Sequence, residues 1–128
     1  MSSIELICLE LSVLLFLAHI VCQAVASNGE FGQAFLFSPR DDPPEPRGVG
    51  VGRATRALAN FVENYGAFVA MDLGLIATGH TGGWGAAVWI AARIVYLPLY
   101  LFGVPVARTV CWSISIVGLL MMLARLAF

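Results

Sequence analysis

The chain contains no lysine, and its seven cationic side chains are all arginines. Charged residues of both signs make up only 12% of the 128 residues, and the formal net charge is −1. Nucleic-acid binding requires a basic face that neutralises phosphates, so this composition excludes that class of function. Each of the few charges that remain is therefore informative.

Cysteine and histidine are also scarce, and their positions argue against disulfides and metal centres. Cys8, Cys22 and Cys111 lie in apolar segments, where a free thiol behaves as a small apolar side chain. His19 and His80 are far apart and follow no ligand spacing. We therefore expect neither a disulfide nor a metal site.

Long apolar runs dominate the sequence instead. Hydrophobic residues make up 59% of the chain, and the mean hydropathy is +0.86, well above the values of soluble domains. A helix that crosses a bilayer needs about 20 apolar residues, so the chain has room for about four such helices. We predict an all-α membrane protein with a single four-helix domain, with spans at about residues 4–26, 53–78, 84–102 and 104–126 and a loop at 27–52.

The first apolar run has a second interpretation as a cleaved signal peptide, because Ala24-Val-Ala26 resembles a cleavage site. Residues 1–5 carry no basic side chain, unlike the start of a signal peptide, so we expect a retained helix. The loop that follows contains Asp41-Asp-Pro-Pro-Glu-Pro46, which cannot continue a helix. The glycine-rich residues 48–52 are expected to separate this loop from the second span.

The orientation in the membrane follows from the arginines. Four of them lie within residues 40–56, and Arg108 flanks the turn between the third and fourth spans. Cytoplasmic loops carry an excess of basic residues, so both of these connections are expected on the cytoplasmic side. Arg125, near the C-terminus, is the one charge that does not fit this orientation, because the C-terminus is then expected on the opposite side.

A polar stripe begins the second span. At about 100° per residue, Arg53, Arg56, Asn60 and Glu63 fall within about 80° of one another and share one helix face. Polar groups at membrane depth are costly and usually functional. The stripe is therefore a candidate site.

A second stripe follows the third span, where Trp89, Arg93, Tyr96 and Tyr100 are spaced by four, three and four residues. An aromatic belt at the interface with a snorkelling arginine is the simpler explanation. Arg93, however, lies near mid-span and needs a carboxylate or a solvated cavity. Because Glu63 reaches a similar depth on the antiparallel second span, we predict that it pairs with Arg93.

These two stripes resemble the motifs of the MAPEG superfamily, which contains the microsomal glutathione transferases and the leukotriene and prostaglandin synthases. The resemblance covers residues 53–128, and before that point only hydropathy and position agree. This chain resembles the unassigned bacterial members of the superfamily more than it resembles the eicosanoid enzymes. The matching pattern is Arg53-x-x-Arg56-Ala-x-x-Asn60-x-x-Glu63-Asn64, then Arg93-x-x-Tyr96-x-x-x-Tyr100, then Arg108.

The resemblance implies a four-helix protomer in a homotrimer, located in the bacterial inner membrane. It also implies glutathione as a co-substrate, bound between neighbouring protomers at the cytoplasmic side. The glutathione-site positions implied in this way are Arg53, Arg56, Asn60, Glu63, Arg93, Tyr96, Tyr100 and Arg108.

The chemistry of these residues fits that ligand. Glutathione carries two carboxylates, an amine and a thiol, which arginines, an acid and tyrosine hydroxyls complement. A neighbouring guanidinium stabilises the reactive thiolate, and Arg108 is our candidate catalytic residue for this role. The expected function is a glutathione-dependent transferase or peroxidase acting on a lipophilic electrophile that arrives from the bilayer.

Two alternatives stay open at this point. Arg56, Asn60, Glu63 and Arg93 could form a buried polar clamp between helices without binding any ligand. Separately, a chain of the same fold could be a non-catalytic accessory or scaffold subunit of a larger membrane assembly. Asp72 lies on a different face of the second span, and the sequence indicates no partner for it.

Overall fold

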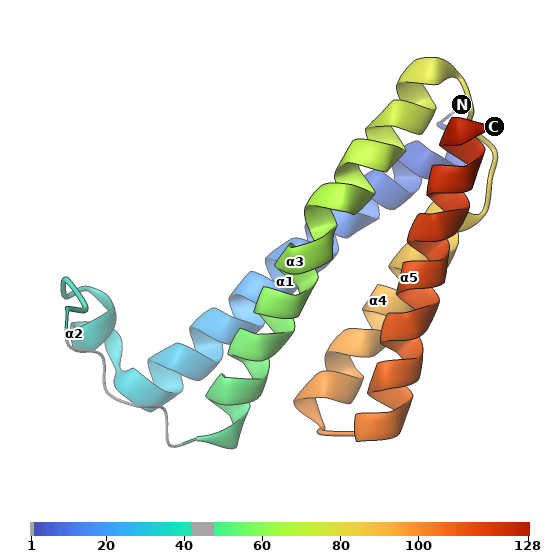
Figure 1. Ribbon diagram of the computed structural model, residues 1–128. Coiled ribbons are helices and arrows are strands. Elements are labelled where there is room, and N and C mark those ends of the chain that lie inside the picture. The colour runs from blue at the N-terminus through green and yellow to red at the C-terminus, as the bar shows by residue number, and fades with distance from the viewer. Residues whose placement is uncertain (1, 42–47) are drawn as a thin grey trace.

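The computed structural model describes residues 2–41 and 48–128, and within these ranges the chain is helical with no strand (Figure 1). Residues 42–47, which contain Arg47 and the proline-rich part of the predicted loop, lie outside the described residues. The helices are α1 (Ile4–Phe31), α2 (Gln33–Leu36), α3 (Val49–Thr78), α4 (Gly85–Leu101) and α5 (Pro105–Ala127).

The long helices α1, α3, α4 and α5 form one bundle, with both chain ends at one end of it and the α4–α5 turn at the other (Figure 1). Helix α1 runs antiparallel to α3, because Ser12 Oγ lies 3.0 Å from Tyr65 Oη and the His19 ring lies 4.5 Å from the Phe61 ring. The short helix α2 lies beside the far end of α1, away from the bundle (Figure 1).

Helix α1 is longer than the sequence indicated, because it continues past residue 26 to Phe31. Polar residues after position 26 do not interrupt it, since Gln23 Nε2 donates a hydrogen bond of 2.8 Å to Ser27 Oγ within the helix. The helix ends at Gly32, whose φ of 78° is a conformation that glycine adopts without steric cost. Residues 27–31 therefore belong to the helix and not to the loop.

The glycine-rich residues 49–52 are helical as well, so α3 begins four residues before the predicted position 53. Packing explains this extension: Val51 is only 5% exposed, and the Gly48 N–H donates to Glu30 Oε1 at 3.0 Å. Tertiary contacts thus outweigh the low helix propensity of glycine at this helix start. The helix ends where Gly79 takes the left-handed conformation with a φ of 74°.

Helices α4 and α5 form a hairpin whose backbones touch through glycine. A Cβ on Gly118 would lie 2.8 Å from the backbone nitrogen of Trp89, and one on Gly85 would lie 2.9 Å from the Gly118 carbonyl oxygen. Such close approach through small residues is typical of helix pairs in membranes. Helix α4 continues through Pro98 to Leu101.

The distribution of polarity on α1 is the reverse of that in a soluble protein. Its buried stripe contains Glu5, Cys8, Ser12, Leu15 and His19, whereas its exposed side chains are mainly leucine, isoleucine and valine. By length and hydropathy, α1 and α5 are long and apolar enough to cross a membrane. Among the described helices α4 is apolar but shorter, with 17 residues.

The core between the helices is aromatic. Phe61 and Phe68 of α3 and Trp89 of α4 are fully buried, and the Phe68 and Trp89 rings stack with centroids 3.9 Å apart. These rings belong to the hydrophobic core cluster between α1, α3, α4 and α5. The candidate site lies at the end that carries the α4–α5 turn.

Candidate functional site

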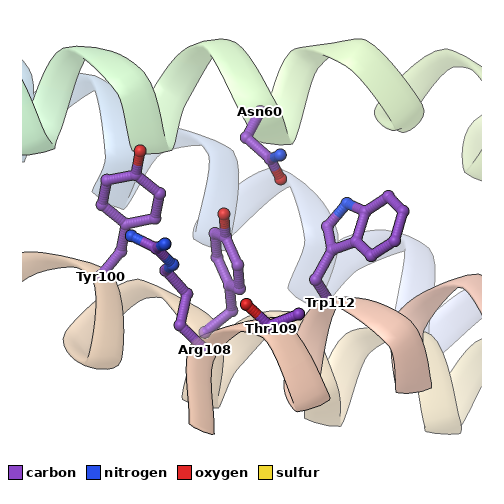
Figure 2. Close-up of a pocket in the computed structure, with 6 residues that line it drawn as sticks. Asn60, Tyr100, Arg108, Thr109 and Trp112 are labelled. Atoms are coloured by element: carbon purple, nitrogen blue, oxygen red, sulfur yellow. The ribbon is translucent and has the colours of Figure 1, made fainter. Parts of the chain in front are cut away.

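A cavity of about 250 Å³ opens between α3, α4 and α5 near the α4–α5 turn. Its walls come from one residue of α3, two of α4 and three of the first turns of α5 (Figure 2). Four of the predicted site positions meet here. The lining residues are Asn60, Tyr96, Tyr100, Arg108, Thr109 and Trp112.

Arg108 stands on the first turn of α5, directly after the Gly103 turn and the Pro105 helix start. Its side chain points toward Tyr100 (Figure 2), and its guanidinium carbon lies 4.7 Å from the centre of that ring. Among the described residues, none accepts a hydrogen bond from this guanidinium or forms an ion pair with it. The cation is therefore stacked on an aromatic face and keeps its donors available for a ligand.

Arg93 is fully buried behind the cavity. Its Nη1 donates a hydrogen bond of 2.8 Å to Asn60 Oδ1, and its guanidinium lies 4.3 Å from the Tyr96 ring centre and 5.4 Å from that of Phe61. Asn60 thus faces the cavity and also holds the buried cation. Because Asn60 and Tyr96 line the cavity, Arg93 positions two of its walls.

The predicted pairing of Arg93 with Glu63 is wrong for the described chain. Glu63 is exposed and forms no ion pair with Arg93, whose polar partner is Asn60. Glu63 lies on the next turn beyond Asn60 and about 60° further round α3, so its side chain is exposed while the Asn60 amide faces Arg93. The prediction matched charge with charge, whereas the structure pairs one guanidinium nitrogen with a neutral amide and leaves Nε and Nη2 of Arg93 without a partner among the described residues.

The remaining arginines of the α3 stripe divide between two environments. Arg53 is half-buried and donates from Nη1 to the Leu101 carbonyl at 3.2 Å. Its guanidinium lies against Gly103, where a Cβ would come within 2.5 Å of it. Arg53 therefore fastens α3 to the α4–α5 turn. Arg56 is exposed and lies over Gly52 of its own helix.

Sequence reasoning missed two wall residues, Thr109 and Trp112. Both follow Arg108 on α5, and Trp112 lies one turn beyond it on the same face. Their spacing from Arg108, one and four residues further along α5, is the signal in the sequence that indicates them. Both side chains are exposed in the single chain, so this wall of the cavity is open.

The described chain is thus a helical bundle with an apolar exterior and a cavity at one end that Arg108 lines. These two features define it as an integral membrane protein with a polar site between its helices. The model of the MAPEG family matches residues 7–128, so the chain belongs to the MAPEG family. The match includes α1, which resembled the family only in hydropathy and position. Neither the curated proteins nor the solved structures include one that matches the chain.

Proposed function

We propose that the protein is a glutathione-dependent transferase or peroxidase that acts on lipophilic electrophiles. The observation that carries this proposal is the Arg108 guanidinium, which lines the cavity and has no acceptor among the described residues. A ligand that places a negative atom next to Arg108 would satisfy it. The thiolate of glutathione is such a group, and membership of the MAPEG family makes it the natural candidate.

The proposed chemistry needs only a fixed positive charge at this position. A guanidinium keeps its charge at every working pH, so it lowers the pKa of a bound thiol without acting as a base. The thiolate then attacks the electrophilic carbon, which forms a C–S bond, and the electron pair displaced from that carbon is protonated. The hydroxyls of Tyr96 and Tyr100 supply further donors in the same cavity.

The proposal includes a homotrimer with glutathione between neighbouring protomers. A cavity of about 250 Å³ is below the range of roughly 300–1,000 Å³ typical of small-molecule sites. One of its walls is open at Thr109 and Trp112. Arg56 and Glu63, which face outward on α3, are then proposed to contact the carboxylates and the amine of a glutathione molecule that a neighbouring protomer helps to enclose.

The four long helices are proposed to be transmembrane, in the inner membrane of a bacterium. The end that carries Arg53, Arg56 and Arg108 is proposed to face the cytoplasm, because basic residues concentrate on that side. The electrophile would reach the cavity from the bilayer, past the apolar outer face of α5.

The second candidate, a non-catalytic scaffold subunit, is favoured by a different observation. Arg53 and Arg93 each donate to a group of the chain itself, a carbonyl and an amide. Those two arginines therefore have a structural role whether or not a ligand binds. Arg108 has no such partner among the described residues, which is why we prefer the enzyme.

Glutathione binding to the purified protein in detergent tests the proposal. We expect binding with the ultraviolet absorbance of a thiolate, at a pH where free glutathione is mostly a thiol. S-methyl glutathione is the matched control, because it binds without the absorbance. If millimolar glutathione neither binds nor gives the signal, the enzyme proposal fails and the scaffold remains.

A further inference from the structure

A second cavity, of about 440 Å³, lies at the opposite end of the bundle, beside the turn between α3 and α4. It is independent of the proposed glutathione site. Both chain ends lie at this end of the bundle (Figure 1). One anionic and one cationic side chain line the cavity, Glu5 of α1 and Arg125 of α5, together with apolar side chains that include Leu75 and Met122.

Glu5 is only 1% exposed. Its Oε1 accepts a hydrogen bond of 3.0 Å from the Gly83 N–H, but its Oε2 is buried and has no partner among the described residues. Asp72 is fully buried nearby, close enough to interact electrostatically with Glu5, and neither of its oxygens has a partner in the described ranges. Three buried carboxyl oxygens, one of Glu5 and two of Asp72, thus lack a donor among the described residues, which is costly unless a ligand supplies one.

Arg125 is fixed on the other side of the same turn. Its Nε donates to the His80 carbonyl at 2.8 Å and its Nη2 to the Thr81 carbonyl at 2.6 Å. Its side chain lies against Gly83, where a Cβ would come within 2.6 Å of Cδ. Both charged side chains therefore contact the turn at Gly83, Glu5 through the N–H and Arg125 through its aliphatic stem. Across residues 2–41 and 48–128, no ion pair joins Glu5 to Arg125.

The position of the cavity indicates where its ligand comes from. It lies where α1 begins and α5 ends, and these are the two helices long and apolar enough to cross a membrane. The ends of such helices lie at the level of the lipid headgroups. Trp84, which lines the cavity and is 69% exposed, is the residue type that prefers this level.

We propose that this cavity binds the headgroup of a phospholipid that carries a primary ammonium, of the phosphatidylethanolamine class. The ammonium lies against the Glu5 carboxylate, which lines the cavity and lacks a donor for one oxygen, and the phosphate lies beside Arg125, whose Nη1 has no acceptor within the described part of the chain. The acyl chains leave past the exposed side chain of Met121, which also lines the cavity. A headgroup with opposite charges matches a cavity whose two opposite charges are not paired with each other in the described chain.

The hydrogen-bonding chemistry selects this class of lipid. A carboxylate oxygen without a donor is satisfied by an N–H group, which a primary ammonium has and a trimethylated one lacks. A lipid without an amine leaves Glu5 unpaired. In the residues that the structure describes, no three metal-ligating side chains meet, which favours an ammonium over a metal ion.

Lipid binding to the delipidated full-length protein in detergent tests this proposal. The shift of the thermal unfolding midpoint with the concentration of short-chain lipid gives Kd, because a ligand of the folded state stabilises it by mass action. We expect phosphatidylethanolamine to bind about tenfold more tightly than phosphatidylcholine or phosphatidylglycerol, the difference of one charge-assisted hydrogen bond.

Glu5→Gln keeps an acceptor for the Gly83 N–H and removes the charge. It should weaken binding of phosphatidylethanolamine to the level of phosphatidylcholine. Glu10→Gln is the matched control, because Glu10 is an exposed glutamate of the same helix, and it should leave Kd unchanged. If Glu5→Gln does not fold, the unaltered protein is tested with phosphatidylethanolamine whose amine carries one, two or three methyl groups. The Kd should rise most with the third methyl group, because it removes the last N–H donor.

Several results would overturn the proposal. Equal affinity for phosphatidylethanolamine and phosphatidylcholine, or unchanged affinity in Glu5→Gln, would remove the role of the ammonium. Tighter binding of phosphatidylglycerol would indicate an anion site at Arg125 alone. Equal protection by free phosphoethanolamine would show that the ligand is a soluble zwitterion and not a lipid.

Discussion

The two ends of the bundle treat buried charge in opposite ways. At the α4–α5 end, each inward arginine lies against neutral groups of the chain: Arg53 against a carbonyl, Arg93 against an amide and rings, Arg108 against a ring. At the other end, Glu5 and Asp72 keep carboxylate oxygens without partners among the described residues. A planar guanidinium can stack on an aromatic face, whereas a carboxylate needs a donor. The cationic end thus keeps N–H donors without acceptors among the described residues, on Arg93 and Arg108, although the rings stabilise their charge, whereas the acidic end keeps acceptors without donors.

The largest expected effect comes from the hairpin that connects both ends. Gly118→Leu should destabilise the fold by more than about 3 kcal/mol, because its side chain would enter the backbone of α4 at Trp89. Both ends would be lost together, which thermal unfolding and binding assays would show. Gly66→Ala is the control: nothing lies within 4 Å of a Cβ there, so the helix should become slightly more stable. Wild-type stability in Gly118→Leu would contradict the close backbone contact.

Arg108→Ala should affect the cationic end alone. If Arg108 stabilises the thiolate, the conjugation rate should fall by about 10²–10³-fold, as for removal of one electrostatic contact in a transition state. Glutathione affinity should change little. Arg56→Ala should do the reverse and weaken binding first, because it loses a carboxylate contact present in the ground state. Steady-state kinetics and thiolate absorbance separate the two, and a full thiolate signal in Arg108→Ala would refute the assignment.

Asn60→Ala should destabilise the protein by about 2 kcal/mol, because it removes the one hydrogen-bond acceptor that Arg93 has in the described chain and leaves a buried charge with ring contacts alone. Asn60→Asp is the companion variant, because it keeps an oxygen that can accept from Arg93 and adds a negative charge beside that cation. Denaturant unfolding in detergent measures both. A neutral effect of Asn60→Ala would mean that water or another protomer already satisfies Arg93.

The smallest change in stability is expected at the acidic end, and it is an increase where the other variants, apart from their controls, lose stability or activity. Asp72→Asn should stabilise the delipidated protein by about 1 kcal/mol, because it removes a carboxyl group that is buried without a partner. Glu10→Gln, at an exposed position, is the control and should have no effect. Destabilisation by Asp72→Asn would show that the carboxylate has a favourable partner that a single lipid-free chain lacks, and the contrast between the two ends would disappear.

The helices could be predicted from the sequence because apolar runs separated by glycine and proline are strong signals. Their ends could not, since they depend on tertiary contacts. The glycine-rich start of α3 is helical because Val51 is buried and Glu30 accepts from the Gly48 N–H. Local propensity alone contains no information about either contact.

The site was predictable in part for the same reason. Spacing placed Asn60, Tyr96 and Tyr100 on faces that meet, and the structure brings them together with Arg108. Spacing could not show which neighbour satisfies Arg93, because that depends on the rotation of α3 against α4. Spacing could have indicated Trp112, which lies one turn beyond Arg108, but it could not show that this face of α5 forms a cavity wall, since that also depends on how α5 packs.

The buried polar stripe of α1 also has a consequence for biogenesis. Ser12 and Tyr65, whose hydroxyls lie 3.0 Å apart, are separated by 53 positions, which a ribosome adding roughly 5–20 residues each second needs about 3–10 s to synthesise. If α1 enters the bilayer as proposed, its inward polar side chains have no partner helix during that interval. The nascent chain is therefore exposed to membrane chaperones and proteases until α3 is inserted, and a chain truncated before α3 should be degraded.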